Sequence, residues 1–217
     1  MNKDRIISFV WFLVLLLVIA ILYFPVSRER FVHLTDTYPY LMGILKIGLL
    51  GIMGDLLGNK IVRGKWQIRG IRISQRILVW GFLGLVFTVV FPLFSHGVEG
   101  LLNSGLLYGK NSIFFAAFWK SFFMNIIFAF PMMIFHRFTD NLIDKDKLFT
   151  IWPVVETFEN INWDNMFRVV GAACIWFWIP AHTITFLLPA EFRVMSAALL
   201  AIVLGFILGL AKRKSLS

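Results

Sequence analysis

Residues 7–26 read ISFVWFLVLLLVIAILYFPV, a run of twenty positions without a charged side chain. A helix needs about 20 apolar residues to cross the hydrocarbon core of a bilayer, which is about 30 Å thick. This stretch therefore predicts a membrane-spanning helix. Lys3 and Arg5 precede it, but no small-residue cleavage site follows it, so we expect an uncleaved anchor rather than a removed secretory signal.

Similar apolar stretches recur along the chain. The predicted spans lie near residues 7–26, 40–57, 77–95, 113–136, 166–188 and 194–211. Backbone amides find no water in lipid, so each span must be helical unless strands close a barrel, and these continuous runs lack the alternation of barrel strands. We predict an all-α, polytopic transmembrane helix bundle that forms one domain over residues 1–217, with an inner interfacial connection at 137–165.

The composition agrees with a membrane protein. Hydrophobic residues make up 59% of the chain and charged residues 15%, with a mean hydropathy of +0.80. Such a composition excludes a soluble globular domain. The net charge of +9 is explained by Lys and Arg residues in loops that lie beside anionic lipid headgroups. We therefore expect the lipid bilayer as a partner, with anionic lipid bound at the inner loop 60–76. We expect no binding of nucleic acid.

The basic residues are divided unequally between the two sides of the predicted bundle. Of the 21 Lys and Arg residues, fourteen lie in the first, third, fifth and last connecting segments, and only four lie in the other connections. Because cytoplasmic loops accumulate Lys and Arg, this bias predicts that the N- and C-termini both lie inside.

Motifs that specify catalysis are missing from the sequence. It contains no phosphate-binding glycine loop, no HExxH and no GxSxG, and its single cysteine, Cys174, cannot form a CxxC site. The four histidines lie on separate segments. We therefore expect no enzyme activity, no cofactor and no metal site, and keep an intramembrane enzyme as the least favoured alternative.

Ionisable groups inside the spans are the candidates for function, because each costs a few kcal/mol in lipid. Lys46 lies near the middle of the second span and Lys120 in the outer third of the fourth, while His182 and Thr185 share a polar stripe on the fifth. If they line one outer cavity, their charge would favour small anions. Alternatively, the lysines snorkel to the interface or pair with Asp55 or Glu99, and His182 bonds a backbone carbonyl.

Other positions receive structural interpretations. Asp55 lies at the inner end of its span and needs a buried donor or cation from another helix, for which Arg76 and Arg168 are nearest in depth. The predicted structural polar residues are Asp55, Asn59, Arg168 and Arg193; the predicted packing glycines are Gly54, Gly58, Gly205 and Gly209; the predicted kinks are at Pro131 and Pro180.

Several of these residues also resemble the sequence motifs of a known family. The stretch 54–62, GDLLGNKIV, resembles the G-D-x-x-x-Q-x-(L/I)-V signature of the Mpv-seventeen/peroxisomal-membrane-protein family. The order of Lys120, Asn125 and Pro131 is similar to its K-x-x-x-D-Q segment and later proline. Its W-P…N-F…V-P-x-x-x-R block resembles residues 178–193. The resemblance covers residues 40–211 and implies a small bundle, here a bacterial member in the cytoplasmic membrane, that can form a weakly selective pore without catalytic residues.

The sequence thus favours a channel-like or permeability-related role for small ions or solutes, with a preference for small anions, in a chain that can form a homo-oligomer. The alternative is a non-conducting structural or assembly subunit that uses its glycine faces and cationic inner loop to hold lipid or protein. A continuous hydrated passage lined by Lys46, Lys120 and His182 would distinguish the pore from the subunit.

Cysteine labelling tests the predicted orientation. A cysteine introduced in place of Lys65 should react with an impermeant thiol reagent only from the cytoplasmic side, and one in place of Asn103 only from the outside, because of the bias in basic residues. Labelling of position 65 from outside would overturn both the span count and the orientation.

Overall fold

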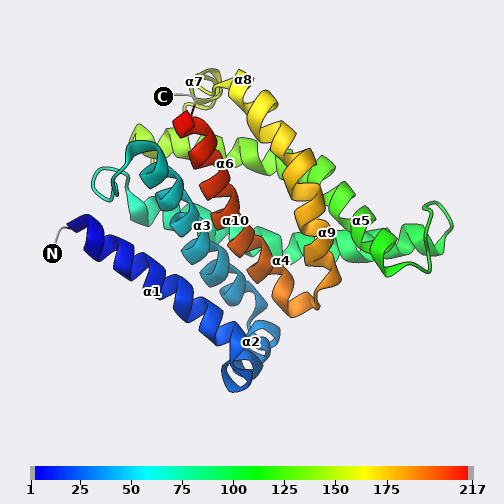
Figure 1. The fold of residues 1–217 in the computed structure, drawn as a ribbon. Coiled ribbons are helices and arrows are strands. Elements are labelled where there is room, and N and C mark those ends of the chain that lie inside the picture. Colours follow the sequence, from blue (N-terminus) through cyan, green and yellow to red (C-terminus); the bar gives the residue numbers. More distant parts are fainter. Residues whose placement is uncertain (1–2, 215–217) are drawn as a thin grey trace.

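The computed structural model describes residues 3–214, and the regular elements of this part of the chain are all helices, without strands. Six helical segments are long and apolar enough to cross a membrane (Figure 1). These are Lys3–Tyr23 (α1), Pro39–Arg63 (α3), Ile73–Asn103 (α4), Ile113–Asp144 (α5 to α6), Trp163–Leu187 (α8 to α9) and Ala190–Lys214 (α10). The prediction of an all-α, polytopic transmembrane bundle is confirmed.

A short helix, α2 (Pro25–Thr37), occupies what the sequence analysis treated as the connection after the first span. The predicted span 7–26 ends earlier, at Tyr23, because Phe24 is extended (ψ 131°) and Pro25 starts the new helix. Proline disfavours a helical residue before it and is well suited to the first turn of a helix. As a result α2 lies beside the ends of α1 and α3 (Figure 1).

The centre of the bundle is α3, which packs along both α4 and α10 (Figure 1). Glycines make the contact with α10 very close: a Cβ on Gly205 would lie 2.7 Å from the carbonyl oxygen of Gly54, and one on Gly209 would lie 3.2 Å from that of Gly58. The two predicted glycine pairs therefore face each other within this chain. On the other side of α3, a Cβ on Gly84 would meet the Gly43 carbonyl oxygen, a contact that the sequence analysis did not identify.

The fourth and fifth spans are both interrupted by π-helical turns just before their prolines. Met124–Ala129 (η1) precedes Phe130–Asp144 (α6), which contains Pro131, and Cys174–Trp178 (η3) precedes Ile179–Leu187 (α9), which contains Pro180. Proline has no N–H and its ring clashes with the carbonyl four residues earlier, so the turn before it widens.

The two interrupted helices lie side by side. Ile113–Phe123 (α5) contacts α9, η1 contacts η3, and α6 contacts a further π-helical segment, Met166–Gly171 (η2). The two π turns before the prolines therefore lie at the same level of the bundle.

The predicted connection 137–165 begins later than expected, because α6 continues to Asp144. Beyond it the chain forms two short helices, Val154–Glu159 (α7) and Trp163–Asn165 (α8). This segment folds back on α6, where the ring of Phe138 lies 5.0 Å from that of Phe158 and 5.6 Å from that of Trp152. Aromatic packing therefore holds the connection at the end of the bundle.

The close contact between α3 and α10 predicts the effect of two matched glycine substitutions. Gly205→Ala should destabilise the bundle by about 1–3 kcal/mol, because its Cβ would press on the Gly54 backbone and force the helices apart. Gly100→Ala, with no atom near the added Cβ, should be neutral or stabilise α4 by about 0.5–1 kcal/mol. Unfolding of the purified proteins in micelles measures both, and equal midpoints for the two variants would contradict the packing.

Candidate functional site

The main candidate site is a half-open cavity of about 270 Å³ between α2, α3, α4 and the start of α10. Its lining comprises Thr35, Asp36, Pro39, Gly43, Lys46, Thr88, Phe91, Pro92, Ala190, Glu191, Arg193 and Val194. We call it the Lys46 cavity. Its walls combine four charged side chains with apolar residues, an unusual lining for a helix bundle in lipid.

Lys46 is the buried charge of this cavity, with only 4% of its surface exposed. Its Nζ donates to the Thr35 hydroxyl at 2.8 Å and to the Glu191 carbonyl oxygen at 3.5 Å, and lies 4.4 Å from the centre of the Phe31 ring. A buried ammonium needs such partners, since water is otherwise its best solvent. The lysine is therefore held inside the bundle by Thr35, Glu191 and Phe31.

Arg193 gives the cavity a second cation. Its guanidinium donates to the Leu188 carbonyl oxygen at 3.1 Å and to the Ser95 hydroxyl at 3.4 Å, and stacks near the Phe186 ring at 5.5 Å. The sequence analysis gave this residue only a structural role. The only signal in the sequence for a role at a site was the position of Arg193 in the P-x-x-x-R segment. The helix α2, which brings Asp36 to the same cavity, could not be predicted because its residues were interpreted as a loop.

Lys120 and His182 do not line this cavity. Lys120 is buried and its Nζ lies 2.6 Å from the half-exposed carboxylate of Glu99, the pairing that the alternative interpretation expected. His182 is 3% exposed and lies behind Phe91, whose ring contacts the imidazole edge-on at 5.9 Å. The structure therefore does not bring Lys46, Lys120 and His182 together in the Lys46 cavity, although Phe91 contacts His182 and also lines that cavity.

Thr185, the fourth predicted lining residue, is fully buried. Its hydroxyl donates to the Ala181 carbonyl oxygen of the same helix at 3.1 Å and lies 2.9 Å from the Ser196 hydroxyl, from which it accepts. The bond with Ser196 joins α9 to α10. Thr185 thus ties two helices together and does not face the Lys46 cavity.

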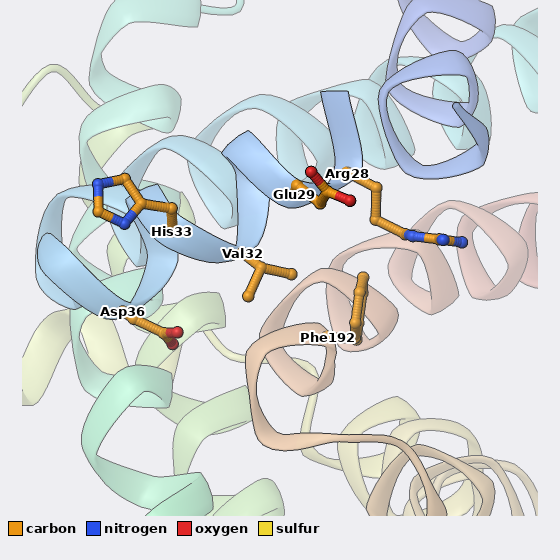
Figure 2. A pocket seen from close by; sticks show the side chains of 6 residues that line it. All are labelled: Arg28, Glu29, Val32, His33, Asp36 and Phe192. Atoms are coloured by element: carbon orange, nitrogen blue, oxygen red, sulfur yellow. The ribbon is translucent and has the colours of Figure 1, made fainter. Parts of the chain in front are cut away.

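A shallow hollow of about 440 Å³ adjoins the cavity between α2 and the first turn of α10. Figure 2 shows that α2 supplies five of its side chains and α10 supplies Phe192. They are Arg28, Glu29, Val32, His33, Asp36 and Phe192. Asp36 lines both depressions, so the hollow and the Lys46 cavity lie next to each other.

At the other end of α3, Asp55 accepts a hydrogen bond from Trp80 Nε1 at 2.8 Å. A donor on another helix was expected, but neither predicted arginine supplies it. Arg76 bonds Asp140 and Asp144 on α6, at 2.5 Å and 2.6 Å, and Arg168 forms an exposed pair with Asp164. Asn59, also predicted as a structural polar residue, is exposed.

Trp80 links Asp55 to a polar cluster that the sequence analysis missed. The Trp80 and His136 rings lie 4.3 Å apart, and His136 Nδ1 lies 3.5 Å from the Asp140 carboxylate. Asp140 in turn bonds Arg76. The cluster joins α3, α4 and α6. The spacing of four residues between His136 and Asp140 was a local signal for part of it, but the contacts between the three helices could not be deduced from spacing.

Within residues 3–214, no group of three or more His, Cys, Asp and Glu side chains is placed to hold a metal ion. No protein-family model matches the chain, and no curated protein or solved structure matches it either.

The Asp55–Trp80 hydrogen bond predicts a coupled loss of stability. Asp55→Leu should cost about 1–3 kcal/mol, because the indole N–H is left without its acceptor, and Trp80→Leu should remove the same bond. Asp55→Asn keeps an acceptor oxygen and should lose less. Unfolding measurements on the single and double variants should give a coupling energy well above 0.5 kcal/mol; strictly additive losses would show that the bond contributes nothing.

Proposed function

We propose that this integral membrane protein has a permeability-related, channel-like role, in which small polar solutes enter the bundle through the Lys46 cavity. The observation that supports it is the cavity itself. Lys46, Arg193, Asp36 and Glu191 line a half-open space between α2 and the membrane-spanning helices α3, α4 and α10, and charges are rare on spanning helices. A space with such a lining accommodates water and small polar molecules better than lipid chains.

Lys46 and Arg193 give the cavity its selectivity in this proposal. Both present N–H donors, and rings of Lys or Arg favour anions in pores. Asp36 and Glu191 offset part of that charge, so the expected preference for anions is modest. The resemblance to the Mpv-seventeen/peroxisomal-membrane-protein family supports a weakly selective, non-enzymatic role in a bacterial cytoplasmic membrane, and this attribution belongs to the proposal.

The alternative of a non-conducting assembly subunit is less well supported. Its main sequence argument was the glycine faces, but Gly54 and Gly58 pack against Gly205 and Gly209 of the same chain and are not free for a partner. The inner loop retains exposed cations at Arg63, Lys65 and Arg69, which suit anionic lipid headgroups in either role.

Flux measurements on purified protein in liposomes test the proposed function. Lys46→Met should lower the permeability for small anions such as chloride about fivefold relative to that for cations, since one unit charge about 4 Å away contributes roughly 1 kcal/mol in water. Lys120→Met should change the preference less, because Lys120 is paired with Glu99 outside the cavity.

Lys65→Met is the matched control, because Lys65 is exposed on the inner loop. Its ion preference should equal that of the unaltered protein. The proposal would be overturned if the unaltered protein raised no flux above empty liposomes, or if Lys46→Met and Lys65→Met behaved alike.

A further inference from the structure

A second group of polar side chains lies where the two π-interrupted helices meet. Ser121, Asn125 and His182 come from the end of α5, from η1 and from α9, and are 0%, 1% and 3% exposed. The His182 ring stacks on Trp178 at 4.8 Å. Buried polar atoms normally have at least one hydrogen-bond partner, so a buried atom without one points to a missing partner.

The hydrogen bonds fix the orientation of each group. Asn125 Nδ2 donates to the Ser121 carbonyl oxygen at 2.8 Å, which can only accept, so the amide nitrogen and not its oxygen faces Ser121. The second amide hydrogen points to His182 Nδ1 at 3.2 Å. That nitrogen must therefore be the acceptor, and the neutral imidazole carries its proton on Nε2.

Two atoms of this group remain without partners. Within the described part of the chain, neither His182 Nε2 nor Asn125 Oδ1 has a hydrogen-bond partner, although both are buried. One is an N–H donor and the other a carbonyl acceptor. Leaving each unsatisfied would cost about 1–3 kcal/mol, which binding of a complementary group would recover.

A hydroxyl group is the simplest complement, because it accepts from an N–H and donates to a carbonyl oxygen. A carboxylate or a halide would satisfy the imidazole but repel the amide oxygen, whereas an ammonium would do the reverse. The site is uncharged and therefore differs in chemistry from the Lys46 cavity.

The geometry points to a second binding site at Asn125 and His182, which takes the hydroxyl group of a small neutral solute, water being the smallest. Phe91 lies between this site and the Lys46 cavity, since its ring contacts His182 at 5.9 Å and also lines the cavity. Phe91 is thus the constriction that a solute passes from one site to the other. This inference rests on the proposed entry through the Lys46 cavity for access, and it adds a neutral hydroxyl-binding step to it.

Solid-state NMR of ¹⁵N-histidine-labelled protein in lipid tests the site without any substitution. The His182 signals, assigned by their loss in His182→Gln, should show a protonated Nε2 and an unprotonated Nδ1, with magnetisation transfer from water, or from glycerol when it is added, to Nε2. A proton on Nδ1, or an Nε2 that receives no transfer from either molecule, would overturn the inference.

Osmotic shrinkage of liposomes in glycerol tests the passage. Phe91→Ala should raise glycerol permeability, and adding Asn125→Leu to it should lower that permeability about fivefold, as expected for the loss of one hydrogen bond. Asn160→Leu, an exposed asparagine on the inner connection, is the matched control and should change nothing. A Phe91→Ala protein that folds but conducts no more glycerol than the unaltered protein would overturn the role of Phe91.

The two tests separate the site from the proposed function. If the unaltered protein carries no solute while His182 Nε2 receives magnetisation from water, the permeability role fails and the hydroxyl site stands. If chloride flux depends on Lys46 but Nε2 receives no magnetisation, the proposed function stands and the site is overturned.

Discussion

In lipid, a buried polar side chain has to find its hydrogen bonds within the protein, and this constraint fixes several contacts between the helices of this bundle. Asp55 on α3 accepts a hydrogen bond from the indole N–H of Trp80, and Lys120 on α5 donates to the Glu99 carboxylate. Lys46 reaches Thr35 on α2. Each bond fixes which faces of two helices meet. The polar residues therefore specify how the helices are arranged, and the apolar residues pack the space between them.

Close backbone contact is the second organising feature, and the prolines add a third. Glycines let α3 approach α4 on one side and α10 on the other, so α3 lies closely packed between these two spans. The fourth and fifth spans instead widen into π turns before Pro131 and Pro180. Asn125 lies in the first of these π turns and His182 lies two residues after Pro180, and both are among the most buried polar residues of the described chain. Regular packing and interrupted helices thus occupy different parts of one bundle.

The sequence predicted the six spans well, because their length and continuous hydrophobicity depend only on local composition. It also placed Gly54, Gly58, Gly205 and Gly209 in helix contacts, without indicating that they meet each other. It did not predict α2, whose polar residues resemble a loop, and it named the wrong cations for Asp55. Sequence gives the depth of a residue in the membrane but not the direction in which it points, and the Lys46 cavity depends on direction.

The position of α2 has a mechanical consequence. This helix is joined to its neighbours through Phe24 and Tyr38, both non-helical residues that precede a proline. What holds it against the bundle is a small set of side-chain contacts: Lys46 with Thr35 and with Phe31, and the Phe31 ring stacked on Phe192 at 5.8 Å. The wall of the Lys46 cavity that α2 contributes therefore rests on side-chain contacts, whereas α3 meets α4 and α10 through close backbone contacts at glycines. Substitutions at Phe31 or Thr35 would act on the cavity through this one wall.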